Sequence, residues 1–194
     1  MKIAIDLNDV YRGYTSQFAS YYKKVIDHSF DIDDVDIWSN DLEQIFPFES
    51  HKQYLDFLYH DCAFEVFGSA APMAKSLPAE LNNWLKEIEN LDEIPEVCFV
   101  STKEFGKSIG ASLFFISKYA INIRECQILL KENEVWDKCD VLITANPNIL
   151  KNVPEDKKVI KINTTYNVDC KCEYEFDSLL ELIRNEEIIE KLNK

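Results

Sequence analysis

One aspartate stands at the end of the first apolar run of this chain, in a place where it could act as a nucleophile. The run Lys2–Ile5 leads into Asp6, and Asn8 follows two positions later. An aspartate at a strand end can attack phosphorus to form an aspartyl-phosphate, and a second carboxyl group nearby would protonate the leaving alkoxide. Asn8 can form hydrogen bonds but cannot deliver that proton. The pattern therefore indicates the nucleophile of phosphoryl transfer without its acid.

Polar side chains also close three of the later apolar runs. Ser101 and Thr102 close one run, Thr144 closes a second and Asn163 closes a third. A hydroxyl group can hold a phosphate oxygen, so Ser101 and Thr102 are candidate phosphate-binding residues. The alternative for each hydroxyl is a local cap of the strand end, and the alternative for Asp6 is a carboxylate satisfied by backbone amides.

The elements that must position these residues follow from the apolar runs. Short runs rich in Val, Ile and Leu predict strands buried on both faces, and helical patterns lie between most of them. This alternation is typical of a parallel sheet with right-handed crossovers, in which sites form at the carboxyl ends of strands. The expected strands are Lys2–Leu7, Val97–Thr102, Glu125–Leu130, Asp140–Thr144 and Lys158–Asn163, and the expected helices are about Tyr14–Asp27, Pro78–Glu89, Lys107–Tyr119 and Asp177–Leu192.

The long segment before Val97 predicts an insertion. Nearly ninety residues separate the first strand from Val97, which is too many for one crossover. We therefore predict one α/β domain over residues 1–194, a Rossmann-like parallel sheet flanked by helices, with a helical cap insertion over residues 11–94. Tyr54, Phe57, Leu58 and Cys62 recur at helical spacing and predict one buried face, in a helix that ends near Gly68. This aromatic stripe indicates core packing, or else a surface that stacks a flat ligand beneath the cap.

Composition and charge exclude several classes of partner. Lys and Arg number 21 against 35 Asp and Glu, a net charge of -14. Such a chain repels phosphate backbones, so we expect no nucleic-acid partner and favour a protein partner or a homo-oligomer. No apolar run is long enough to span a membrane and no secretory signal is recognised, so we expect a cytoplasmic protein without membrane association. The six cysteines are expected to be free thiols, and the three histidines are too far apart to suggest a metal cluster.

Four segments, in this order along the chain, resemble the four motifs of the haloacid dehalogenase superfamily. They are Asp6-x-Asn8-Asp9-Val10, Val97-x-x-Val100-Ser101-Thr102, Lys131, and Asp140-Val-Leu-Ile-Thr144-Ala145-Asn-Pro147. The resemblance is greatest to the 5′(3′)-deoxyribonucleotidases and spans nearly the whole chain. It implies a fold of the haloacid dehalogenase type, with a helical cap inserted after the first strand.

The resemblance assigns roles to the acidic positions. Asp6 would be the nucleophile and a metal ligand, and Asn8 stands in place of the general acid. Asp9 is adjacent, but on a strand it would point to the opposite face from Asp6. Thr144 and Ala145 stand where the family has two acids, so Thr144 offers a metal only a neutral oxygen.

The resemblance also assigns the phosphate-binding positions. Ser101 or Thr102 would hold a phosphate oxygen. Lys131 fills the place of the family's lysine by its order in the chain, whereas Lys138 lies nearer the fourth motif. An exposed, solvated lysine is the alternative for either.

The missing acids favour a protein that keeps the fold without the reaction. The loss of general acid–base help alone typically reduces a rate by about 10²–10⁴-fold. We therefore expect a catalytically degenerate protein, without a cofactor, that serves as a structural, docking or ligand-binding component. A nucleotide or phosphate is a candidate ligand, and a phage particle or host cytoplasm is a candidate location. The alternative is an active Mg²⁺-dependent 5′-nucleotidase or phosphatase, which acts on (deoxy)nucleoside monophosphates through an aspartyl-phosphate.

Overall fold

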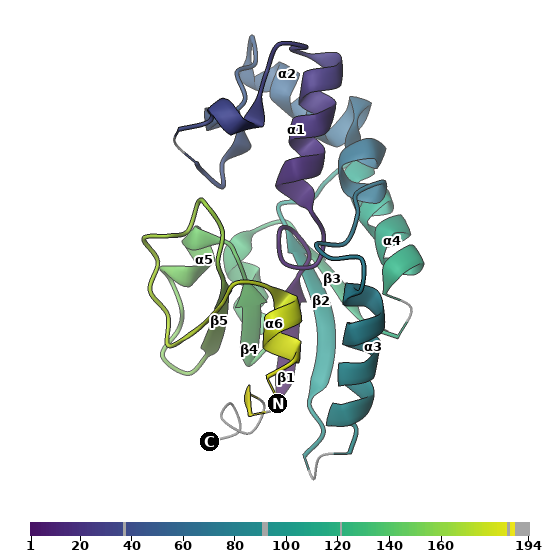
Figure 1. Ribbon diagram of the computed structural model, residues 1–194, viewed down its shortest axis with the longest axis vertical. Helices are drawn as coiled ribbons and strands as arrows, with labels where there is room; N and C mark the ends of the chain where they lie inside the picture. The colour runs from purple at the N-terminus through teal and green to yellow at the C-terminus, as the bar shows by residue number, and fades with distance from the viewer. Residues whose placement is uncertain (37, 91–92, 121, 186, 189–194) are drawn as a thin grey trace.

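Six parallel strands form one sheet at the centre of the computed structural model, which describes residues 1–36, 38–90, 93–120, 122–185 and 187–188 (Figure 1). The strand order is β3-β2-β1-β4-β5-β6. From β1 the chain adds β2 and β3 on one side of β1, and then crosses back to add β4, β5 and β6 on the other side. The reversal lies between β1 and β4, and an open α/β sheet usually binds its ligand beside such a reversal. The strands are β1 (Lys2–Asp6), β2 (Glu96–Thr102), β3 (Cys126–Leu129), β4 (Val141–Thr144), β5 (Lys158–Ile162) and β6 (Tyr174–Phe176).

Apolar side chains cover both faces of this sheet, as the sequence predicts. Along β1, Ile3 and Ile5 belong to one core and Ala4 belongs to the other, and each is at most 1% exposed. Strands buried in this way have no solvent face, which explains their continuous apolar runs. All five expected strands are present, and their bounds differ from the predicted ones by at most one residue at each end. The α/β class with a Rossmann-like parallel sheet is therefore confirmed.

Helices pack on each face of the sheet. Buried residues of α3, α4 and α6 share the core of Ile3 and Ile5, whereas Ile149 of α5 and Trp136 join the core of Ala4. The predicted helix Lys107–Tyr119 is found with those bounds, but the predicted Asp177–Leu192 is only Leu179–Ile183, and residues 186 and 189–192 of it lie outside the described residues. The helices are α1 (Tyr14–Val25), α2 (His51–Asp56), α3 (Leu77–Ile88), α4 (Lys107–Tyr119), α5 (Pro147–Leu150) and α6 (Leu179–Ile183).

The segment between β1 and β2 builds a third core, which is rich in aromatic side chains. Three of the four residues of the predicted face, Phe57, Leu58 and Cys62, are buried in it, whereas Tyr54 is only partly buried. The run that contains them ends at Gly68, as predicted. In Figure 1, α1 and α2 lie beyond the carboxyl end of β1, whereas α3 lies beside the sheet. The division into a domain and a cap over residues 11–94 stays a prediction.

Two further expectations concern the whole chain. All six cysteines are free thiols, as predicted, and Cys62, Cys98, Cys139 and Cys170 are buried. Among the described residues, no helix has both the length and the apolar character needed to cross a bilayer.

Candidate functional site

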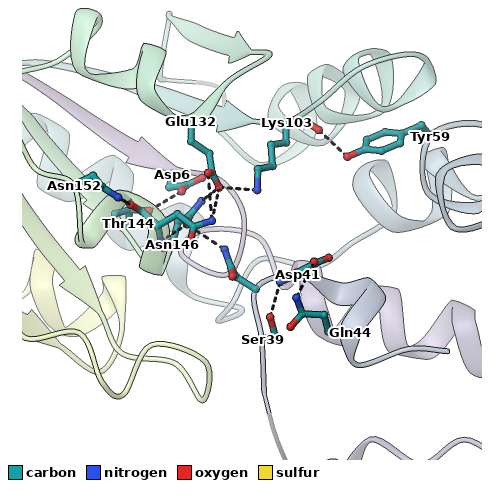
Figure 2. Close-up of polar contacts among 12 residues, drawn as sticks. Asp6, Ser39, Asp41, Gln44, Tyr59, Lys103, Glu132, Thr144, Asn146 and Asn152 are labelled. Carbon is teal, nitrogen blue, oxygen red and sulfur yellow. Dashed lines mark hydrogen bonds and ion pairs between the residues drawn. The ribbon is translucent and has the colours of Figure 1, made fainter. Parts of the chain in front are cut away.

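A cavity of about 510 Å³ lies at the carboxyl ends of the central strands. The strand ends contribute Asp6 and Asn146, and the segment between β1 and β2 contributes Asp41 and Tyr59 (Figure 2). The two sides of the cavity touch where Asn40 Nδ2 donates to Asn146 Oδ1 at 3.3 Å. This place adjoins the reversal of strand order between β1 and β4, where the topology favours a ligand site.

Asp6 lines the cavity at the end of β1, and Thr144, which is completely buried, lies behind it. Its carboxylate is 4% exposed, and Thr144 Oγ1 donates to Asp6 Oδ2 at 2.7 Å. The same Thr144 hydroxyl accepts from the Asn146 backbone N–H at 3.1 Å. Burial raises the pKa of Asp6 to about 7, although the bonds from Thr144 and from the Asn8 backbone act in the opposite direction. Thr144 is therefore a hydrogen-bond donor to the candidate nucleophile.

The expectation that Asp9 points away from Asp6 is wrong. β1 ends at Asp6, and Asp9 lies in a turn with a φ of 56°, so the strand alternation does not extend to it. Asp9 also lines the cavity, where its carboxylate accepts from Thr15 N at 2.8 Å, Thr15 Oγ1 at 2.5 Å and the Tyr166 hydroxyl at 3.0 Å. Burial raises its pKa in spite of these three donors.

A fully buried arginine holds the side chain of Asn8. Arg12 Nε and Nη2 donate to Asn8 Oδ1 at 3.1 and 2.5 Å. Its remaining N–H groups reach the Phe67 carbonyl at 2.9 Å, Ser112 Oγ at 2.7 Å and Glu104 Oε1 at 3.1 Å. All five donors of the guanidinium are thus matched with acceptors inside the protein. The sequence did not predict these hydrogen bonds between Arg12 and Asn8.

Glu104 belongs to the same buried network and accepts a hydrogen bond from Ser101. Both side chains are completely buried, and Glu104 Oε1 accepts from Ser101 Oγ and, at 2.8 Å, from Ser112 Oγ. Glu104 Oε2 has no hydrogen-bond partner, so the charge of Arg12 is the main compensation for this carboxylate. Ser101 does not line the cavity. Its hydroxyl is therefore committed to the network and is not placed to hold a phosphate.

The other residues predicted for the phosphate site lie in three different places. Thr102 is 8% exposed and lines the cavity. Lys131 instead lines a neighbouring groove with Trp136. Lys138 lies near Glu125. Glu125 directly precedes β3 and pairs with Lys2 at the start of β1, so Lys138 lies at the opposite end of the sheet from the cavity.

Lys103 and Glu132 are site residues that the sequence reasoning missed. Lys103 Nζ pairs with Glu132 Oε1 at 2.9 Å, and Glu132 Oε1 also accepts from Asn146 Nδ2 at 2.7 Å (Figure 2). Lys103 directly follows Thr102 and Glu132 directly follows Lys131, and both Thr102 and Lys131 were predicted site residues near a strand end. Position at a strand end was thus a usable signal for both.

The backbone at Lys103 predicts a measurable effect of substitution. Its φ is 59°, in the left-handed region that side chains with a Cβ rarely adopt. We expect Lys103→Gly to be about 1 kcal/mol more stable than Lys103→Ala, because both variants lose the ion pair and only glycine relieves the backbone. Urea unfolding of the two variants would measure this difference. Equal stability would contradict a left-handed backbone at this position.

Aromatic rings form one wall of the cavity. Tyr14 and Phe67 lie with ring centroids 5.3 Å apart, Phe67 and Tyr59 lie 6.2 Å apart, and Tyr59 stacks on Phe105 at 3.7 Å. The Tyr59 hydroxyl donates to the Lys103 carbonyl at 2.8 Å, which fixes the wall to the end of β2. Of the predicted aromatic stripe, Phe57 is buried in the aromatic core and Tyr54 lines the cavity.

The charge of the cavity lining is negative. Five carboxyl side chains line it, against one lysine and His51. Two like charges about 6 Å apart in an effective dielectric of about 20 repel each other by about 3 kcal/mol. A phosphate dianion would meet several such carboxylates, so the lining disfavours the nucleotide or phosphate ligand that the resemblance implies.

The residues at the end of β4 fit poorly with the Mg²⁺ ion of an active family member. Mg²⁺ prefers carboxylate oxygens, but Thr144 donates its hydroxyl to Asp6 and Ala145 has no oxygen in its side chain. The oxygen of the Asn146 side chain caps the start of α5 by accepting from Asn148 N. Across the described residues, no group of three His, Cys, Asp or Glu side chains is placed to hold a metal ion. The expectation of no cofactor stays a prediction.

In comparisons with known proteins, no protein-family model and no curated sequence matches this chain.

Proposed function

We propose that this chain is a haloacid-dehalogenase-like protein that no longer transfers phosphoryl groups and acts as a ligand-binding component. The proposal rests on one observation above all: the buried guanidinium of Arg12 holds Asn8 at the position where the family has its acid. An amide that accepts two hydrogen bonds from a permanent cation supplies no proton to a leaving group.

Two further contacts support the loss of phosphoryl transfer. Ser101 donates its hydroxyl to Glu104, and Thr144 donates its hydroxyl to Asp6. Both side chains would have to abandon buried partners before they could bind phosphate or metal. Abandoning a buried hydrogen bond leaves an unsatisfied group and is unfavourable.

The cavity is the reason to favour ligand binding over a purely structural role. Its volume of about 510 Å³ is within the range of small-molecule sites, about 300–1,000 Å³. Docking into an assembly, a phage particle included, is supported only by the acidity of the chain.

An assay of the wild type and of Asn8→Asp tests this function. We expect neither to hydrolyse deoxynucleoside monophosphates or p-nitrophenyl phosphate in the presence of Mg²⁺. A carboxylate at position 8 would lie against Arg12, which favours its ionised form and lowers its pKa, so it would not donate a proton. Hydrolysis by the wild type that Asp6→Asn abolishes would defeat the proposal. Hydrolysis gained by Asn8→Asp would show that Arg12 does not block this position.

A further inference from the structure

We propose that the cavity binds a small organic cation, with an ammonium or guanidinium group, and not a phosphate ester. This inference rests on the proposed ligand-binding function and names the chemical class of the ligand. It follows from the charges that remain unmatched in the cavity and from the aromatic wall beside them.

The basic side chains that line the cavity already contact carboxylates. Lys103 Nζ pairs with Glu132 Oε1 at 2.9 Å, and His51 Nδ1 contacts Glu43 Oε2 at 2.6 Å. Each pair leaves no net positive charge for an anionic ligand. A phosphate group would have to displace a carboxylate to reach either basic side chain.

Three carboxyl groups of the lining remain without such a partner. The donors to Asp6 and Asp9 are neutral, and Asp41 accepts from Gln44 Nε2 at 3.1 Å. The charge of Arg12 lowers the pKa of Asp6 and of Asp9 without forming an ion pair with either. Among the described residues, none of these three carboxylates forms an ion pair. Burial has raised the pKa of Asp6 and of Asp9, and a bound cation would favour the ionised form of both.

The aromatic wall supplies the second half of a cation site. A cation within about 6 Å of a ring centroid is attracted by the negative face of the ring. One cation already uses this wall from within the protein, since the Arg12 guanidinium carbon lies 5.0 Å from the centroid of Phe67. Tyr14, Tyr59 and Phe105 also line the cavity. Carboxylates and aromatic rings in one lining together suit a small organic molecule that carries a positive charge.

Calorimetric titration at about 150 mM salt tests the inference, since this ionic strength screens the general attraction of cations to an acidic chain. The probes are agmatine and choline, with 3,3-dimethylbutan-1-ol as the neutral counterpart of choline, and thymidine 5′-monophosphate and inorganic phosphate as anions. We expect saturable binding of at least one cation, at least tenfold weaker binding of the neutral alcohol, and none of the anions. Tighter binding of either anion, or no binding of either cation, would overturn the inference.

Matched variants locate the binding. Asp41→Asn removes one charge from the lining, and Asp156→Asn removes one from an exposed turn outside it. We expect about a tenfold loss of cation affinity in the first variant and no change in the second. Phe105→Leu, at a ring that is 41% exposed, should weaken binding several-fold with little effect on folding. An equal effect of Asp41→Asn and Asp156→Asn would mean unspecific attraction and would count against the site.

Two sources could supply the same cation, and one comparison separates them. Tighter binding of N-acetylarginine amide than of agmatine would indicate a side chain of a partner protein, and the reverse would indicate a free amine. The hydrolysis assay is independent of all these titrations. A protein that hydrolyses nucleotides would defeat the proposed function, whereas one that neither hydrolyses nor binds a cation would defeat only the present inference.

Discussion

Replacing Arg12 with methionine is expected to lower the free energy of unfolding by about 3–5 kcal/mol. Arg12 is completely buried, and its ion pair with Glu104 at 3.1 Å is buried on both sides. Methionine would fill most of the space but would leave the Glu104 carboxylate without its charge partner in the core. The variant would also leave Asn8 Oδ1, Ser112 Oγ and the Phe67 carbonyl without the donors that satisfy them.

Urea unfolding followed by tryptophan fluorescence would measure this loss, and two variants make it specific. Arg184→Met breaks an ion pair with Glu80 in which the side chains are 57% and 33% exposed, so we expect a loss below about 1 kcal/mol. Adding Glu104→Gln to Arg12→Met removes the orphaned charge and should restore about 2 kcal/mol. A loss in Arg12→Met no larger than in Arg184→Met would contradict the buried network.

The Arg12 network fixes the residues on which one side of the cavity rests, since its members Asn8 and Phe67 line the cavity. It connects the turn after β1, the end of β2 and helix α4 through Asn8, Ser101 and Ser112. Each of these elements contributes or supports residues of the cavity. A network in which nearly every polar atom is satisfied fixes one arrangement of its members, because any other arrangement leaves a buried group unpaired.

The part of the site that could be predicted from the sequence is the part set by strand ends. Ile3 and Ile5 mark β1 by their burial pattern, so Asp6 follows at its carboxyl end. Because parallel strands end at the same edge of a sheet, Asp6 and Thr144 were expected to meet, and they lie in hydrogen-bond contact. Local pattern and topology were sufficient for these positions.

The remainder depends on contacts between distant residues. Arg12 and Glu104 are 92 positions apart, and neither stands in a pattern that indicates a buried charge. The turn at Asp9 was read as a continuation of the strand, because a single residue with positive φ has no signature when it is not glycine. β6 was missed because Tyr174–Phe176 is only three residues long, with an exposed glutamate at its centre.

Asp6→Asn is expected to change how stability depends on pH. Burial raises the pKa of Asp6 from 3.8 to about 7, so the folded protein keeps a proton there at pH values where the unfolded chain has released it. The stability that this group contributes is complete below pH 3.8 and is lost as the pH rises through 7. Asparagine has no such proton to lose. Between about pH 5 and pH 8.5, the stability of the variant relative to the wild type should therefore increase by about 3 kcal/mol of unfolding free energy.

Urea unfolding of both proteins across this pH range measures the gain, and Asp140→Asn is the control. The Asp140 carboxylate accepts from the Lys2 backbone N–H, which lowers its pKa, so it is ionised in both the folded and the unfolded state throughout the range. Its substitution should shift stability by the same amount at every pH. A constant difference for Asp6→Asn as well would contradict a buried, proton-holding carboxyl group. The measured gain would mean that the ionised Asp6 carboxylate destabilises the fold at neutral pH, as expected for a carboxyl group whose burial raises its pKa.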